Sequence, residues 1–290
     1  MDDGQANRLL GYPPDARLLI INADDYGMCH AVNDAVLRTI RDGVVTSTSL
    51  MTPCPWAPHA MHLLRDHPQL AFGVHLTLVS EFSPYRWGPV ASRDRVPSLV
   101  DEAGHLVIYD HIPDLLERAR LDEVEIEFRA QIDVVLAAGL LPTHLDWHCI
   151  ADGGRDDIFE LTLRLAREFG LAMRIHDPAH AARCRTLGLP ANDHGVLDSY
   201  HLDPAEKPVT FVELLRRLPA GLSEWAAHPS LGDTEAQAIE PETWQIRRAD
   251  LDFFTSQTAR DVIAEEGITL LNYRALQPYW SARIDNNAQT

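Results

Sequence analysis

The chain has 290 residues, of which 46% are hydrophobic and 23% are charged, a composition typical of folded globular proteins and atypical of disordered ones. Its 43 acidic and 25 basic residues give a formal charge of −18, which would repel polyphosphate and anionic lipid. We therefore expect no nucleic-acid partner and no membrane association. The longest apolar run near the start, residues 18–21, is far too short for a membrane span or a signal peptide, so a cytoplasmic location is expected. The four cysteines are too few and too scattered for a disulfide framework, and free buried thiols are predicted.

Short apolar runs alternate with amphipathic stretches along the chain, as in α/β folds. Residues 1–16 are polar and contain Pro13 and Pro14, which predicts a loose N-terminal arm. The predicted strands are 17–23, 44–50, 70–78, 143–147, 172–175, 223–227 and 268–271. The predicted helices are 30–41, 58–66, 122–138, 157–169, one opening at the capping box Thr210–Glu213, and 255–266.

About seven strand–helix units predict a distorted or incomplete (β/α) TIM-like barrel over residues 17–290, as a single domain. A doubly wound open sheet is the alternative architecture. No GxGxxG or GxxxxGK[ST] motif follows the first strand, so nucleotide binding has no support. Residues 81–112 are rich in Pro, Ser, Trp and Arg, which predicts a lid-like excursion from the core.

Two carboxylates, Asp24 and Asp25, follow the first predicted strand. The carboxyl ends of parallel strands are where α/β enzymes place their sites. Adjacent carboxylates repel unless they share a cation or a proton, so a metal bound by one would leave the other free as a base. The alternative is a helix N-cap, for which Asp is a common residue.

Histidines lie near the ends of two further predicted strands. His75 stands in an apolar run, where a packed core histidine is the usual interpretation. Alternation along the strand at 143–147 points His144, Asp146 and His148 to one face, and three metal-binding side chains on one face favour a site over an edge strand facing water. With Asp25, His75 and His148 would make a two-His, one-carboxylate metal site.

Other polar residues have more ambiguous settings. His228 follows a late strand and is either a general acid or ligand, or a loop histidine beside a proline. Arg174, between two apolar residues, is a candidate ion-pair partner for a site carboxylate. Cys149 adjoins His148, but neighbours on a strand point to opposite faces, so we expect a packed thiol rather than a Cys–His pair.

These motifs together resemble the YdjC-like carbohydrate deacetylase family, which includes the chitooligosaccharide deacetylases. The resemblance runs from about residue 17 to residue 276. Its matching pieces are residues 21–27, Asn33, residues 43–51 and 73–78, residues 142–148, Arg174, Glu224, His228–Pro229 and Tyr273–Arg274. Many members continue the HLDxH motif with further histidines, whereas here His148 is followed by Cys149–Asp152, so part of the substrate-facing wall differs.

The resemblance implies a distorted barrel and a hydrolase that removes the acetyl group from an N-acetylated sugar or small oligosaccharide. It implies one divalent metal ion, Mg²⁺ or Zn²⁺, held by Asp25, His75 and His148. It also implies that Asp24 is the base and His228 the acid.

The remaining polar and aromatic candidates would support that site. Asp146 and His144 would orient the ligands, and Arg174 would keep Asp24 ionised. Trp147 and Trp87 would either stack on a sugar or pack in the protein.

Two other functions stay open from the sequence, a metal-dependent isomerase or lyase on the same barrel and a non-catalytic sugar-binding relative. The expected partner is a small carbohydrate, and a homodimer is the default oligomer.

Overall fold

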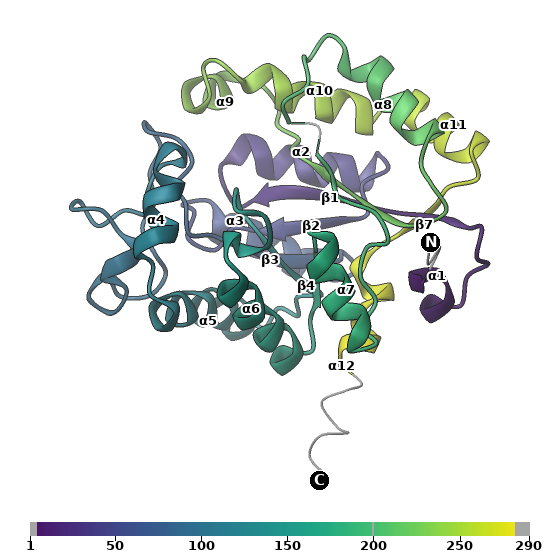
Figure 1. Ribbon diagram of the computed structural model, residues 1–290. Coiled ribbons are helices and arrows are strands. Elements are labelled where there is room, and N and C mark those ends of the chain that lie inside the picture. The colour runs from purple at the N-terminus through teal and green to yellow at the C-terminus, as the bar shows by residue number, and fades with distance from the viewer. Residues whose placement is uncertain (1–4, 199, 282–290) are drawn as a thin grey trace.

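The computed structural model describes residues 5–198 and 200–281, and shows a curled sheet of parallel strands enclosed by helices (Figure 1). Neighbouring strands follow the order β5-β4-β3-β2-β1-β7-β6, and β8 also pairs with β1. The strands are β1 (Arg17–Tyr26), β2 (Ser47–Leu50), β3 (Phe72–Leu76), β4 (His144–Trp147), β5 (Ala172–Met173), β6 (Leu197–Asp198), β7 (Gly221–Ala227) and β8 (Thr269–Leu271).

The central strand β1 organises this sheet because it is long enough to pair with three others. One edge pairs with β7 over residues 17–23, while the other edge pairs with β8 over residues 18–20 and with β2 beyond them. Within the described part of the chain no ladder joins β5 to β6. The prediction of an incomplete (β/α) barrel is therefore confirmed.

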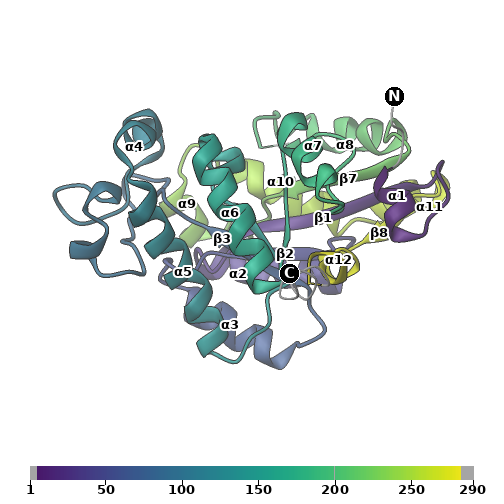
Figure 2. The ribbon, with the colours of Figure 1, turned by 60° about the horizontal axis from the view of Figure 1, so that its bottom comes forward.

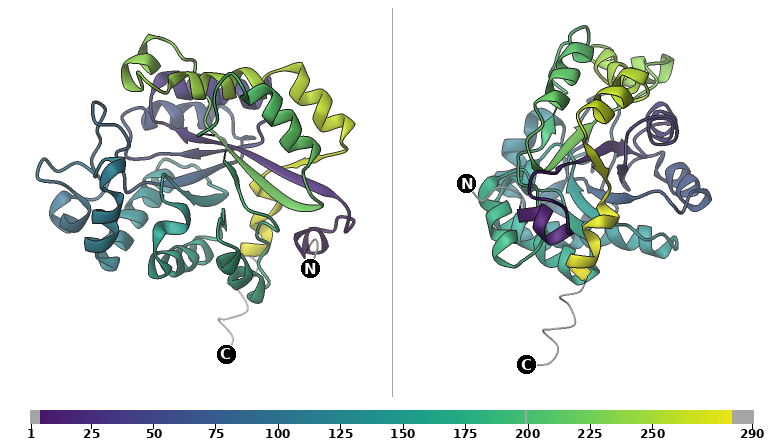
Figure 3. Two further views of the ribbon diagram at one scale, coloured as in Figure 1. Left: turned by 45° about the horizontal axis from the view of Figure 1, so that its top comes forward. Right: turned by 90° about the vertical axis from the view of Figure 1, so that its right-hand side faces the viewer.

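Helices pack around the outside of the curled sheet (Figure 3). The row α8, α10 and α11 lies along one side, and α5, α6 and α7 lie along the other (Figure 1). The helices are α1 (Gln5–Leu10), α2 (His30–Arg41), α3 (Ala57–Asp66), α4 (Ile112–Arg118), α5 (Leu121–Ala137), α6 (Asp156–Phe169), α7 (Pro178–Thr186), α8 (Lys207–Arg216), α9 (Thr234–Ile239), α10 (Trp244–Phe254), α11 (Gln257–Glu265) and α12 (Gln277–Ser281). Among the described helices, none combines the length and apolar character that a membrane crossing requires.

Apolar spacing explains why the longer helices form where predicted. In α5, Val124, Phe128, Ile132 and Val135 are fully buried, at the separations of three and four residues that line one helix face. Helix α6 ends at Gly170, whose φ of +66° is the left-handed conformation favoured by glycine. These helices hold the sheet that positions the site.

Several local predictions are wrong. Thr210 lies inside α8, which begins at Lys207, so it does not cap that helix. The sequence patterns also predict no element at strand β6 or at helices α1, α4, α7, α9, α10 and α12. The two residues of β6 are too few to show a periodic pattern, and α7 has no clear apolar stripe.

The N-terminal segment is not loose over residues 5–16. Helix α1 buries Asn7, whose side-chain amide donates to the carbonyls of Pro13 (3.0 Å) and Ala16 (2.8 Å). Residues 1–4 of the predicted arm, and residues 282–290 of the predicted barrel domain, lie outside the described residues.

The excursion over residues 81–112 is an irregular segment that projects beyond the sheet next to α4 and α5 (Figure 2). Val96, Leu99 and Leu106 are buried in it. Glu127 on α5 accepts hydrogen bonds from the backbone N–H groups of Val90 and Ala91, both at 2.9 Å. The segment is thus anchored to the core, and lid-like movement stays a prediction.

Candidate active site

The carboxylates of Asp24 and Asp25 both reach one cavity because the backbone of β1 departs from regular strand geometry there. Asp25 has a φ of +66°, and the register between β1 and β2 shifts between Ala23 and Tyr26. Successive side chains on a regular strand point to opposite faces, and an irregularity of this kind re-aims one of them. Helix α2 begins only at His30, after Cys29, so the N-cap interpretation of the two aspartates is wrong.

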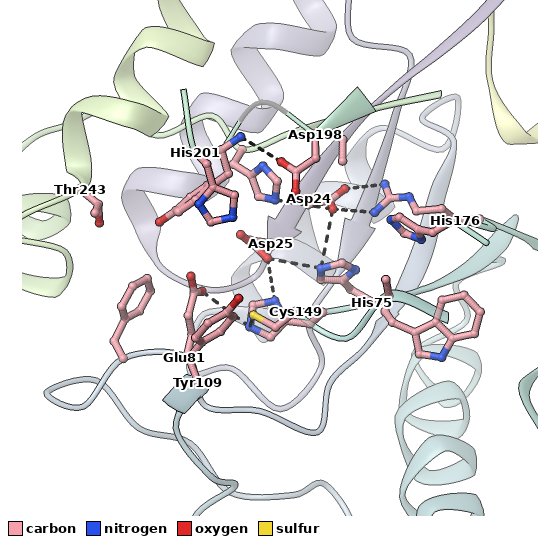
Figure 4. A pocket seen from close by; sticks show the side chains of 18 residues that line it. Asp24, Asp25, His75, Glu81, Tyr109, Cys149, His176, Asp198, His201 and Thr243 are labelled. Atoms are coloured by element: carbon pink, nitrogen blue, oxygen red, sulfur yellow. Dashed lines mark hydrogen bonds and ion pairs between the residues drawn. The ribbon is translucent and has the colours of Figure 1, made fainter. Parts of the chain in front are cut away.

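Asp25, His75 and His148 converge from the ends of β1, β3 and β4. The Oδ1 atom of Asp25 lies 3.4 Å from Nε2 of His75 and 3.1 Å from Nδ1 of His148 (Figure 4). All three residues are buried, and one potential ligand atom from each lies within 4.8 Å of the others. One carboxylate oxygen and two imidazole nitrogens at this spacing fit a single divalent cation.

Asp146 orients the first of these imidazoles. Its Oδ1 lies 2.9 Å from Nδ1 of His75, while its Oδ2 accepts a hydrogen bond from Ser49 and lies 3.3 Å from Nη2 of Arg174. A carboxylate that accepts the Nδ1 proton leaves Nε2 as the free nitrogen, which is the arrangement seen around metal-bound histidines.

Negative charge dominates around His75. Burial lowers the pKa of His75, but the charges of Asp146 and Asp24, and the hydrogen bonds that Asp146 and Asp25 accept from the ring, raise it to about 10. The cluster therefore attracts a cation at Nε2, whether a proton or a metal.

Asp24 is held by a buried arginine. Nη1 and Nη2 of Arg174 donate to the two oxygens of Asp24 at 2.6 and 2.7 Å, and Nε of Arg174 donates to Glu224 at 2.8 Å. Burial raises the pKa of Asp24, but the charge of Arg174 and its hydrogen bonds outweigh burial and leave the pKa below its ordinary value. Asp24 is consequently a charged carboxylate, and its Oδ2 also lies 4.0 Å from Nε2 of His75.

His228 follows β7 and lines the same cavity. Its Nε2 lies 3.8 Å from Oδ2 of Asp24, and its backbone N–H donates to Asp250 at 2.8 Å. Asp250 in turn forms an ion pair with the buried Lys207 at 2.6 Å. His228 thus lies in the loop after β7, beside Pro229, as one interpretation expects, and it also lines the cavity, so its role as acid or ligand stays a proposal.

His144 lies behind the cavity rather than in it. Its ring is fully buried and stacks on Tyr273, with 3.6 Å between ring centroids. Burial lowers its pKa to about 3, so it is a neutral packed histidine, and its Nε2 is 3.8 Å from Asp146. Trp147 lines the cavity, whereas Trp87 is buried outside the lining and packs near the His148 ring, at 6.2 Å.

The sequence did not reveal two ionisable residues of the site. Nη1 of Arg247, on α10, donates to Oδ2 of Asp25 at 2.6 Å, and its Nε forms an ion pair with Glu240 at 2.7 Å. Glu81, at the start of the excursion, has its Oε2 atom 3.6 Å from Nε2 of His148. Burial raises the pKa of Glu81 to about 8. No local pattern marks either residue.

The thiol of Cys149 packs against the core as predicted, but the expectation that it lies away from the His148 ring is wrong. Three cysteines are buried and free, but Cys149 is only half-buried, and its Sγ lies 3.2 Å from Nε2 of His148. Strand β4 ends at Trp147, and Cys149 has a φ of +59°, so strand alternation no longer applies there.

The cavity has a volume of about 400 Å³ and opens to the surface. Its lining combines acidic and imidazole groups with four aromatic side chains, Phe82, Tyr109, Trp147 and Tyr200. Aromatic walls with a few convergent polar groups are typical of a site for a small organic ligand.

Several known proteins are similar to this chain in sequence or in structure. Residues 18–265 match the family described as YdjC-like protein. The carbohydrate deacetylase of Enterococcus faecalis is 33% identical over 89% of this chain and 97% of its own, and that of Geobacillus stearothermophilus is 34% identical with the same coverage. The chitooligosaccharide deacetylase of Serratia marcescens is 29% identical over 90% of this chain and 99% of its own.

A crystal structure from Enterococcus faecalis, of a protein named as a candidate for cellobiose-phosphate cleavage, is also similar. It superimposes with a TM-score of 0.76 and 30% identity, over 90% of this chain and 99% of that one. With the family match covering most of the described residues, the chain belongs to the YdjC-like protein family.

Proposed function

We propose that the chain is a metal-dependent carbohydrate deacetylase, which hydrolyses the acetamide of an N-acetylated sugar or small oligosaccharide. The observation that carries the proposal is the position of Asp24. This charged carboxylate lies beside the three candidate ligands but is held by Arg174, and the imidazole of His228 lies 3.8 Å away. A base and an acid flanking a candidate metal site in one cavity match the needs of amide hydrolysis. The relatives named carbohydrate deacetylase support the same chemistry.

Asp25, His75 and His148 would hold the divalent metal. A carboxylate with two imidazoles suits Zn²⁺, and Mg²⁺ is the other candidate that the family resemblance implies. Such an ion lowers the pKa of water and polarises a carbonyl oxygen. Arg247 donates to the carboxylate of Asp25 at 2.6 Å, and Asp146 accepts from the His75 ring at 2.9 Å. These two contacts would hold both ligands in position.

Two residues beside the ligands carry out the two proton transfers. Asp24 takes the proton of the attacking water, and Arg174 keeps Asp24 ionised before that step. His228 gives a proton to the departing amine. The backbone contact of His228 with Asp250 keeps the ring at the cavity wall, on the side of Asp24.

Aromatic side chains would receive the sugar. Trp147 and Tyr109 line the cavity and present ring faces or edges on which pyranose C–H groups can pack. A cavity of about 400 Å³ suits a mono- or disaccharide. The cytoplasmic location and the homodimer expected from the sequence stay predictions.

An acetate-release screen tests the proposed function. The probes are N-acetylglucosamine, di-N-acetylchitobiose and tri-N-acetylchitotriose, each incubated with protein stripped by chelator and then with Mg²⁺ or Zn²⁺ restored. We expect release of one acetate per turnover only when a metal is restored.

The other two candidate functions give different outcomes in this screen. An isomerase or lyase would change the sugar while its acetyl group stays in place. A binding protein would retain the sugar without turnover. Either result, with no acetate from any probe, would refute the proposal.

A further inference from the structure

A second group of metal-binding side chains lies on the other side of the His148 ring from Asp25. Nδ1 of His148 is 3.1 Å from Oδ1 of Asp25, whereas its Nε2 is 3.2 Å from Sγ of Cys149 and 3.6 Å from Oε2 of Glu81. The sulfur, the nitrogen and a carboxylate oxygen of these last three residues all lie within 4.8 Å of one another (Figure 4).

These separations match those between ligands of one ion. Two donor atoms that each bind Zn²⁺ at its usual distance and subtend a tetrahedral angle are about 3.4 to 3.6 Å apart. The observed separations of 3.2 and 3.6 Å at Nε2 of His148 lie close to this range. Only small side-chain adjustments would be needed to place an ion between them.

Glu81 supplies an independent indication. Its side chain is 12% exposed, and among the described residues its Oε2 atom has no hydrogen-bond partner. Nη2 of Arg247 is 3.5 Å away, but that contact is not a hydrogen bond. A buried carboxylate oxygen without a partner is costly, and a bound cation would satisfy it.

The backbone at Cys149 brings the thiol to the site. Its φ of +59° is a conformation that residues other than glycine adopt at a cost of about 1–3 kcal/mol, and such strain is concentrated at functional sites. In a continued strand, Sγ would point away from the side chain of His148. Here the turn folds it back toward Nε2.

We infer that Glu81, His148 and Cys149 form a second cation site, which takes a thiophilic divalent ion such as Zn²⁺ or Co²⁺. The thiol gives its proton to solvent as the sulfur–metal bond forms, and no oxidation state changes. A neutral imidazole has one lone pair, so His148 serves one ion at a time. With an ion at Nε2, the ring proton is on Nδ1 and donates to Asp25. The site does not depend on the proposed deacetylase activity.

Cobalt binding to the full-length, chelator-stripped protein tests this site, because a thiolate bound to Co²⁺ absorbs in the near ultraviolet. We expect this charge-transfer band to rise with added Co²⁺ in the unmodified chain. It should be lost in Cys149→Ala and in Cys149→Ser, and the Kd should rise about tenfold or more in Glu81→Gln. The matched thiol control, Cys184→Ala on α7, should keep the band. Circular dichroism checks that each variant is folded.

Asp25→Asn separates the two sites. It removes a ligand of the first site while its amide oxygen can still accept the Nδ1 proton of His148. We expect this variant to keep the cobalt–thiolate band and to lose acetate release. The inference is refuted if the unmodified chain shows no such band, or if folded Cys149→Ala shows the same band as the unmodified chain.

Discussion

Replacing Asp24 by asparagine tests the assignment of the base. The substitution removes a charge that accepts two hydrogen bonds from Arg174, at 2.6 and 2.7 Å, and leaves the candidate ligands Asp25, His75 and His148 unchanged. General base catalysis contributes about 10²–10⁴ in rate. We therefore expect kcat to fall by that factor, equivalent to about 3–5 kcal/mol of transition-state stabilisation.

The same substitution has a calculable effect on stability. The asparagine oxygen can still accept one guanidinium N–H, while its amide nitrogen faces the other, so one charge-assisted hydrogen bond is lost. That loss is worth about 1.5–3 kcal/mol. It should lower the Tm by several degrees, at about 2–4 °C per kcal/mol for a chain approaching this size.

Kinetics, elemental analysis and thermal melting are measured together on Asp24→Asn. The control is Asp198→Asn, because Asp198 also lines the cavity, but its side chain contacts the backbone N–H of Tyr200 and not the ligands. The control should keep metal and kcat. If Asp24→Asn binds metal normally and turns over within about threefold of the unmodified chain, then Asp24 is not the base.

Three further predictions concern the ligands, the buried acid and the packing behind the site. Asp146→Asn removes the carboxylate that accepts the Nδ1 proton of His75. Metal affinity, measured by competition with a chelator, should therefore fall about 10–100-fold. Unchanged affinity would exclude an orienting role for Asp146. In metal-free protein, the pKa of Glu81 is raised from 4.5 to about 8, so its stabilising contribution is complete below pH 4.5 and is lost as the pH rises through 8. Glu81→Gln should therefore gain stability relative to the unmodified chain between pH 5 and 8 in urea titrations, and a constant difference over that range would contradict the shift. A Cβ at Gly73 would lie 2.6 Å from the His144 ring, so Gly73→Ala should cost about 1–3 kcal/mol of unfolding free energy, and an unchanged Tm would show that the ring can move.

Much of the candidate site was predictable because parallel strands bring their carboxyl ends to one edge of a sheet. Asp25, His75 and His148 each lie near the carboxyl end of a strand that the apolar pattern predicts, so the sheet topology favours their convergence. Residue alternation also placed Asp146 on the same face as His148. His144 shows the limit of that reasoning. Alternation puts it on the same face, two residues before Asp146, but its ring lies behind the cavity and stacks on Tyr273.

The sequence by itself determined the α/β class, the positions of most strands along the chain and the three candidate ligands, because these depend on local hydrophobic periodicity and on a general rule of sheet topology. Only the tertiary structure decided that Arg247, 222 residues beyond Asp25 in the chain, donates to its carboxylate, and that Glu81 is buried against His148. It also decided that Cys149 turns its thiol toward the same ring. Such contacts depend on how distant segments pack and on individual backbone dihedral angles, and neither leaves a periodic signal in the order of residues.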